Sequence, residues 1–292
     1  MQHTLAGPAI FAGVGMHTGE RVRVAVRPAP AGSGIVFVRT DIRDRDNRVP
    51  VGGEVVVQTR LGTVIANAAG VKVATIEHLM AALCALGVDN ATVELDGPEI
   101  PIMDGSAEPF VQMIDHAGRK RQEAGRRSIE ILEPIEVFEG DKRAALLPSE
   151  QFEMAFEIAF ESAAIGRQRV DIALDETSFR EELSNCRTFG FVHEVEALRK
   201  AGLARGGSLE NAVVIDGDRI LNPEGLRRPD EFVRHKALDA VGDLYVLGAP
   251  VIGRFEGLYA GHGLNNALVR ALLARPQAWR YRPPVMALAE AV

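Results

Sequence analysis

The feature that most constrains the fold is a series of strand-like segments followed by helix-like ones, and this series occurs twice along the chain. In the first half, residues 21–27 alternate polar and apolar side chains, which is typical of a half-buried strand. A helix predicted over 76–86 begins after Thr75, a candidate N-cap, and ends before Gly87. A second helix follows 104–106 and ends at Gly118. The other strands predicted in this half are 35–38, 54–57, 71–73 and 91–95.

From Ser128 onward the same order recurs. Strands are predicted over 129–138, 144–147, 152–160, 212–215 and 251–259. Helices are predicted over 192–200, 231–247 and 265–274. Two halves of like order favour a duplicated α+β unit, with the boundary in the basic stretch 119–127, expected to be a solvated linker. We therefore expect domains over 1–124 and 125–284, with a fraying tail over 285–292.

Composition excludes several functional classes. No apolar run reaches the roughly 18 residues that span a bilayer, and the N-terminus lacks a signal-peptide pattern, so we expect a cytoplasmic protein without membrane insertion. The net charge of -7 argues against a broad nucleic-acid-binding surface. Two cysteines, Cys84 and Cys186, are too few for a disulfide framework or a four-cysteine zinc site.

The predicted helix over 231–247 carries an unusual polar stripe. His235, Asp239 and Asp243 are spaced at i, i+4 and i+8, so they lie along one side of the helix. Apolar residues flank this stripe, so we expect the helix to be covered on both sides. A buried polar group without a partner costs roughly 1 to 3 kcal/mol. The stripe therefore predicts either a buried hydrogen-bond ladder or a metal site.

Other histidines stand in unusual neighbourhoods. His78 follows Glu77 at the start of the first helix, and His262 lies between two glycines at a strand-to-helix turn. Two histidines and one carboxylate leave zinc an open position for water. His78, His235 and Asp239 supply such a set, with Glu77 as candidate base and His262 as candidate acid. We expect this site in a cleft between the two halves.

A loop over 13–19 contains three glycines but matches neither a Walker A motif nor a dinucleotide fingerprint. Together with other segments it nevertheless resembles a known family, the zinc-dependent UDP-3-O-acyl-N-acetylglucosamine deacetylases of lipid A synthesis. The resemblance extends from Thr4 to Tyr281. The segments that carry it are 13–19, 75–79, 98–106, 187–191, 206–208, 230–243 and 261–262.

The resemblance implies two domains of like topology, each a β-sheet with helices packed against it, and with the helices between the sheets. It implies that His78, His235 and Asp239 hold one zinc ion per chain, with ferrous iron as the alternative. Glu77 would be the general base. The other catalytic residues would be His262, the acid or cationic stabiliser, Asp243, which orients it, and Thr188, a hydroxyl donor to the oxyanion.

The resemblance also implies a substrate path. Residues that match its diphosphate and uridine positions are Lys236, Phe160, Phe189, Phe191 and Glu194. The acyl passage would be lined by Val192, Val195, Leu209, Ala212 and Val214. Tyr259 stands where the family often has a lysine, so Lys142 is expected to assist Lys236 at the diphosphate.

The expected activity is hydrolysis of the 2-acetamido group of a small-molecule substrate, acylated UDP-N-acetylglucosamine, in the committed step of lipid A synthesis. The products would be acetate and a free 2-amino sugar nucleotide. We expect a monomer and no nucleic-acid partner. One alternative is a catalytically silent relative that binds UDP-sugars as a regulator, although Glu77, His78 and the other predicted catalytic residues are present. Another is a metal-dependent amidase for a different acylated substrate.

Overall fold

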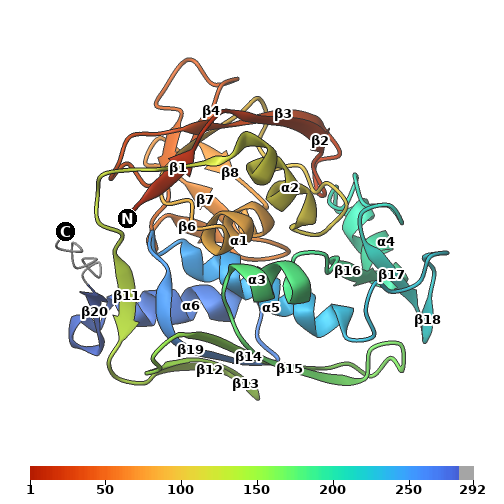
Figure 1. The fold of residues 1–292 in the computed structure, drawn as a ribbon. Helices are drawn as coiled ribbons and strands as arrows, with labels where there is room; N and C mark the ends of the chain where they lie inside the picture. The colour runs from red at the N-terminus through yellow and green to blue at the C-terminus, as the bar shows by residue number, and fades with distance from the viewer. Residues whose placement is uncertain (283–292) are drawn as a thin grey trace.

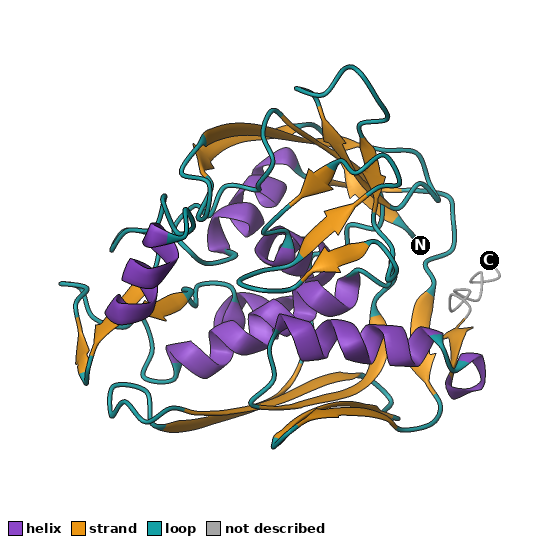
Figure 2. Ribbon diagram, turned by 180° about the vertical axis from the view of Figure 1, so that it is seen from behind, coloured by secondary structure: helices purple, strands orange, loops and turns teal. Residues whose placement is uncertain are grey.

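The structure, a computed structural model, describes residues 1–282, so the predicted tail over 285–292 lies outside it. Strands of the first half form the upper layer in Figure 1, and the large sheet of the second half forms the lower layer. The main helices lie between these layers, as the view from behind in Figure 2 also shows. The predicted α+β class, with helices between two sheets, is therefore confirmed.

The upper layer is built mainly from a five-stranded sheet. In spatial order its strands are β2 (Ala9–Val14), β3 (Arg21–Pro28), β9 (Ala91–Leu95), β4 (Ile35–Arg39) and β5 (Arg48–Pro50). A small sheet beside it contains β6 (Val56–Gln58), β7 (Val64–Ala66) and β8 (Lys72–Val73). The alternation predicted in β3 is confirmed, since Val22, Val24 and Val26 are buried while Arg21 and Arg23 are exposed.

The lower layer is a seven-stranded sheet. Its strands are β11 (Ser128–Ile131), β12 (Ile135–Glu139), β13 (Lys142–Leu147), β14 (Phe152–Ala159), β15 (Arg167–Ala173), β19 (Val251–Leu258) and β20 (Trp279–Arg282). The central strand is β19, which pairs antiparallel with β13 and parallel with β11 and β14. The single strand predicted over 129–138 is in fact two strands, β11 and β12, and β15 was not predicted.

A third region projects from the second half. It contains β16 (Phe189–Phe191), β17 (Val213–Asp216), β18 (Arg219–Ile220) and helix α4 (Val192–Lys200). Figure 1 shows this unit at one end of the molecule, beside the N-terminal end of the long helix α5 (Glu231–Tyr245). It is placed to form one wall of a cavity at that end.

The predicted linker over 119–127 is only partly a linker. Arg119–Arg121 form β10, which pairs antiparallel with β1 (His3–Leu5). The Arg119 guanidinium donates to Glu176 at 2.7 Å, so this basic run is held by groups far away in sequence. Local charge patterning could not reveal these partners. Within residues 1–282, every sheet takes all its strands from one side of residue 124, but the two-domain division stays a prediction.

The predicted helices are present with shifted ends. Besides α4 and α5 the chain forms α1 (Glu77–Ala85), α2 (Glu108–Ala117), α3 (Glu176–Ser178) with a following π-helical turn (Phe179–Leu183), α6 (His262–Leu273) and a short 3-10 turn (Pro276–Ala278). Gly87 and Gly118 have φ of +67° and +72°, which suits the predicted helix stops. Across residues 1–282, no helix is both long and apolar enough to span a membrane.

The prediction that Thr75 is the N-cap of α1 is wrong. Ile76 is the N-cap of α1, and no side chain caps this end. Thr75 instead adopts a positive φ of 57° and its hydroxyl donates to the buried Glu99 carboxylate at 2.9 Å. A β-branched residue in this conformation is strained, which is common beside functional sites.

Helices α1 and α5 pack closely against each other at the centre of the molecule. Gly242 of α5 lies directly on α1, because a Cβ atom at this position would be 2.0 Å from the Glu77 carbonyl oxygen. The missing side chain therefore lets the two backbones approach. This approach brings the start of α1 beside the polar stripe of α5.

We predict that Gly242→Ala lowers the free energy of unfolding by about 1 to 3 kcal/mol, since the added methyl group must push α1 and α5 apart. Gly52→Ala is the matched control, because a Cβ atom there meets no heavy atom within 4 Å. Chemical denaturation of both variants measures the difference. Equal stability of Gly242→Ala and the wild type would contradict the close packing described here.

Candidate metal centre

Three buried side chains from α1 and α5 converge at the centre of the molecule. The ligand atoms of His78, His235 and Asp239 all lie within 4.8 Å of one another. Nε2 of His78 is 3.4 Å from Asp239 Oδ1, and Nε2 of His235 is 3.3 Å from the same oxygen. Asp239 Oδ1 is buried and accepts no hydrogen bond from any group of residues 1–282. A buried carboxylate oxygen facing two imidazole nitrogens suits a divalent cation.

Groups around the cluster fix its protonation. The ring nitrogen Nδ1 of His235 donates a hydrogen bond to the Cys186 carbonyl oxygen at 3.0 Å. This bond keeps the proton on Nδ1 and leaves Nε2 free to ligate. Burial lowers the pKa of His235 to about 4, so the ring is neutral. Burial alone would raise the pKa of Asp239, but His235 and Lys236 hold it well below its usual range. Neutral imidazoles and an ionised carboxylate are the forms that bind metal.

Lys236 lies beside the cluster on the cavity side. Its ammonium donates to Asp239 Oδ2 at 3.0 Å, so the two carboxylate oxygens have different surroundings. Burial by itself would lower the pKa of Lys236, yet the Asp239 carboxylate raises it. A positive charge therefore stands next to the candidate ligands.

Glu77, like Asp239, is a buried carboxylate with few hydrogen-bond partners among the described residues. Its Oε2 accepts the Thr63 backbone N–H at 3.0 Å, and its Oε1 is 4.0 Å from Nε2 of His262. Burial raises the pKa of Glu77, although His262 and His78 partly offset this effect. A carboxylate with a raised pKa is suited to accept a proton.

His262 is the first residue of α6 rather than part of the preceding turn, because α6 begins three residues earlier than predicted. Its Nδ1 lies 2.8 Å from Asp243 Oδ2, the orienting contact expected from the resemblance. Burial alone would lower the pKa of His262, but Asp243 and Asp239 raise it to about 9. The ring is therefore protonated at neutral pH and can donate from Nε2.

Two further residues fix Asp243, and the sequence did not single them out. The Thr63 hydroxyl donates to Asp243 Oδ1 at 2.5 Å, and the Asn265 amide donates to Oδ2 at 2.9 Å. Thr63 lies 180 residues before Asp243, in a segment with no motif. Asn265 lies in the first turn of α6, where its three-residue spacing from His262 could have marked it.

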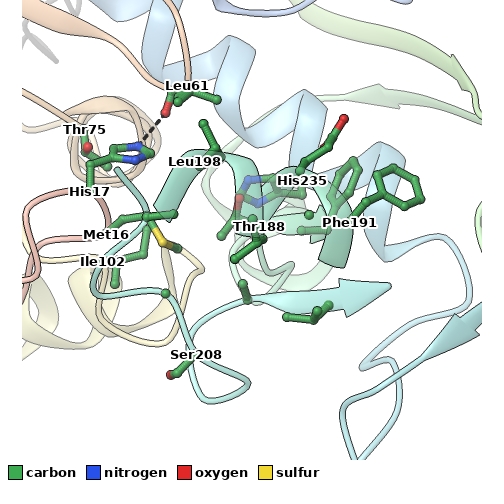
Figure 3. A pocket seen from close by; sticks show the side chains of 18 of the residues that line it. Met16, His17, Leu61, Thr75, Ile102, Thr188, Phe191, Leu198, Ser208 and His235 are labelled. Carbon is green, nitrogen blue, oxygen red and sulfur yellow. Dashed lines mark hydrogen bonds between the residues drawn. The ribbon is translucent and has the colours of Figure 1, made fainter. Parts of the chain in front are cut away.

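The cluster opens into a cavity of about 570 Å³. Figure 3 shows His17, Thr75 and Ile102 on one side and Thr188, His235 and Phe191 on the other. The cavity therefore lies between the two halves of the sequence, as expected. The predicted oxyanion donor Thr188 lines this cavity. The predicted substrate residues that also line it are Phe160, Phe189, Phe191, Val192, Glu194, Val195, Leu209, Ala212, Val214 and Lys236.

One wall of the cavity is apolar. The rings of Phe160 and Phe189 lie 5.7 Å apart, and those of Phe160 and Phe191 lie 5.9 Å apart. Phe160 and Leu209 remain more than a third exposed, so they border the cavity where it meets solvent. An apolar wall leading from a polar metal cluster suits a ligand with a polar head and an acyl chain.

The loop over 13–19 contributes Met16 and His17 to the opposite wall of the cavity. The buried Glu99 carboxylate accepts the backbone N–H groups of His17 and Thr18 at 3.0 Å each. Nε2 of His17 in turn donates to the Leu61 carbonyl at 2.9 Å. Glu99 thus holds the 13–19 loop in place, a role that comparison with phosphate-binding motifs did not reveal.

Lys142 is not brought to this cavity. It lies at the start of β13, half-exposed, with its ammonium 3.9 Å from Glu139. Within the described residues it is absent from the cavity lining, so in this conformation it does not assist Lys236.

Comparisons with known proteins give matches over nearly the whole chain. Residues 2–274 match the family model described as UDP-3-O-acyl N-acetylglycosamine deacetylase. A UDP-3-O-acyl-N-acetylglucosamine deacetylase of Phenylobacterium zucineum is 72% identical over 291 residues, covering 100% of this chain and 99% of that protein. Proteins of the same name from Myxococcus xanthus and Acidithiobacillus ferrooxidans are 50% and 49% identical, covering 97% and 96% of this chain and 89% and 92% of theirs.

We predict that His78→Ala, His235→Ala and Asp239→Ala each weaken zinc binding by at least about tenfold, because each removes one of three converging ligands. Competition with a chromophoric chelator measures the affinity. His116→Ala, on the last turn of α2, is the control and should bind zinc like the wild type. Unchanged affinity in any of the three ligand variants would place the metal elsewhere.

Proposed function

The chain belongs to the family of UDP-3-O-acyl N-acetylglycosamine deacetylases, and from this premise we propose how its own residues carry out the hydrolysis. The enzyme removes the acetyl group from the 2-acetamido nitrogen of UDP-3-O-acyl-N-acetylglucosamine, a step of lipid A biosynthesis. The relatives carry the name of the active enzyme, which favours this function over a silent regulator.

His78, His235 and Asp239 would hold one zinc ion, or ferrous iron as the alternative. The supporting observation is that the buried Asp239 Oδ1, which has no hydrogen-bond partner in the described part of the chain, lies 3.4 Å from Nε2 of His78 and 3.3 Å from Nε2 of His235. When bound, such an ion polarises the acetyl carbonyl and lowers the pKa of water at the site to about 7. The chain itself must then position the substrate and move the protons.

Glu77 would accept the proton of the attacking water. Its Oε2 is held by the Thr63 N–H, which leaves Oε1 directed toward His262 and the metal cluster. Addition of water to the acetyl carbon forms a carbon–oxygen bond, and the negative charge passes to the carbonyl oxygen. The Thr188 hydroxyl, which lines the cavity, would donate to that oxygen.

His262 would donate the proton that the departing nitrogen needs. Asp243 holds the ring at Nδ1 and keeps it protonated, so Nε2–H faces the cavity with Glu77 nearby. Cleavage of the carbon–nitrogen bond then releases acetate and the 2-amino sugar nucleotide. Two groups with raised pKa values, one a base and the other an acid, match the two proton transfers.

The cavity walls would orient the rest of the substrate. Lys236 supplies the positive charge for the diphosphate, and Phe160, Phe191 and Glu194 would lie around the uridine side. Val195, Leu209 and Ala212 would contact the acyl chain. We further propose that the enzyme acts as a cytoplasmic monomer without a nucleic-acid partner. Acetate release from the acylated UDP-sugar by the zinc-loaded protein tests the function directly, and no release would contradict it.

We predict that Glu77→Ala and His262→Ala each lower kcat by at least about a hundredfold, the scale of positioned acid and base groups. Neither residue is among the ligands, so both variants should retain one zinc ion per chain. Acetate release combined with metal analysis measures both properties. Retained turnover in either variant would remove the role assigned to that residue.

A second prediction concerns pH. His262 has a pKa raised to about 9, so it carries its proton at neutral pH and loses it as the pH rises through that value. Turnover should therefore fall on the alkaline side, and the residual activity of His262→Gln should lack this fall. The pH profile of kcat for both proteins checks the assignment. An identical alkaline limb in the variant would assign it to another group.

A further inference from the structure

Three consecutive residues connect the metal cluster to the cavity wall. The carbonyl oxygen of Cys186 accepts a hydrogen bond from Nδ1 of the candidate ligand His235 at 3.0 Å. Two residues later, the side chain of Thr188 lines the cavity. Arg187 lies between them and is only 2% exposed, which makes it one of the largest fully buried side chains.

Arg187 binds a buried partner on the metal-binding helix itself. Its backbone N–H and its Nε both donate to Glu231 Oε1 at 2.9 Å, and its Nη2 lies 3.2 Å from Oε2. Glu231 is completely buried and is the first residue of α5, one turn before His235. A single carboxylate thus holds both the backbone and the side chain of Arg187 against α5.

The remaining contacts reach one more carboxylate and two backbone groups. Nη1 of Arg187 donates to Oε1 of Glu224 at 2.5 Å, and the Glu224 side chain is 54% exposed to solvent. Nη2 of Arg187 donates to the Gly225 carbonyl at 2.7 Å, and Glu231 Oε2 accepts the Arg227 N–H at 2.8 Å. The ion pair therefore fixes the loop that leads into α5 as well as the segment that carries Thr188. A forked guanidinium can make these bonds together, whereas a lysine ammonium cannot reproduce their geometry.

The backbone of Thr188 is held from two other sides. Its N–H donates to the Gly105 carbonyl at 2.8 Å, and its carbonyl accepts the Val213 N–H at 2.8 Å. These bonds attach Thr188 to the first half of the chain and to β17, but neither ties it to α5. The Arg187–Glu231 contact supplies that connection, since it joins the residue before Thr188 to the helix that carries two candidate ligands.

We propose that Arg187 and Glu231 are positioning residues for the deacetylation. The pair holds the Cys186 carbonyl on His235 and the Thr188 hydroxyl at a fixed place relative to the metal, so one buried contact sets both the ligand orientation and the oxyanion donor. This inference rests on the proposed role of Thr188. Neither residue touches substrate; both act through their neighbours.

The test removes both charges together, so that no buried charge is left unpaired. Arg187→Met/Glu231→Gln keeps an oxygen for the Arg227 N–H. The control is Asp115→Asn/Arg180→Met, which breaks a bidentate pair between α2 and the turn 179–183, away from the cavity lining. We expect the first double variant to lower kcat about tenfold to a hundredfold with KM little changed, because small misplacements of reacting groups are costly. The control should stay within about twofold of the wild type.

A spectroscopic readout tests the ligand half of the inference without turnover. In the Co²⁺-substituted protein, the visible absorption bands should shift for Arg187→Met/Glu231→Gln and stay unchanged for the control. Arg187→Lys is the second variant if the first does not fold, and it should show the same two effects more weakly. Wild-type kcat together with a wild-type Co²⁺ spectrum in the folded variant would overturn the proposal.

Adding Thr188→Val separates this inference from the proposed function. If Arg187 and Glu231 act through Thr188, Thr188→Val should cause little further loss of kcat in the double variant, since groups that act as a unit are not additive. Losses that multiply would overturn the positioning role while leaving the function of Thr188 intact. Full activity of Thr188→Val alone would instead contradict the proposed function at that residue.

Discussion

The close approach of α1 and α5 is the constraint on which the site depends. Gly242 leaves room for the Glu77 carbonyl, and this places the first turn of α1 against the middle of α5. Glu77 and His78 are the first two residues of α1, while His235 and Asp239 lie one turn apart on α5. A wider spacing of these helices would separate the two imidazoles, which come from different halves of the chain. Packing and chemistry therefore depend on the same contact.

The electrostatics of the site follow from burying many charges together. Glu77, Asp239 and Asp243 are each less than 5% exposed, and burial alone would raise the pKa values of Glu77 and Asp239. The partners differ, so the outcomes differ: Asp239 stays ionised beside Lys236 and His235, while Glu77, which has weaker partners, has a raised pKa. Asp243 accepts bonds from Thr63, Asn265 and His262 and keeps the last of these protonated. The charged groups near each side chain thus determine whether it is suited to be a metal ligand, a base or an acid.

The sequence predicted much of this arrangement, for identifiable reasons. The i, i+4, i+8 stripe of α5 indicated a polar face on a covered helix, and α5 is indeed buried on nearly all sides. The His78, His235 and Asp239 set followed from ligand chemistry, and the structure brings these residues together. The resemblance named Thr188 and the apolar wall, which line the cavity.

What could not be predicted depends on contacts between distant segments. The roles of Thr63, Glu99 and Glu231 could not be predicted, because these roles come from partners 14 to 180 residues away. The N-cap prediction at Thr75 failed because its hydroxyl donates a hydrogen bond to Glu99 instead of accepting one from the N–H groups at the start of α1. Lys142 was expected at the diphosphate because Tyr259 replaces a family lysine, but its strand places it at a hairpin outside the cavity lining. Sequence motifs indicate which residues carry reactive groups, but tertiary contacts determine which of these residues lie close together.

The central claim is that two imidazoles and one aspartate converge on a single divalent ion. X-ray absorption spectroscopy of the zinc-loaded protein measures this coordination directly. The account predicts a first shell of two imidazole nitrogens and oxygen ligands, with zinc–nitrogen distances of about 2.0 to 2.1 Å and no sulfur. A sulfur scatterer at about 2.3 Å, or a shell without imidazole, would contradict it.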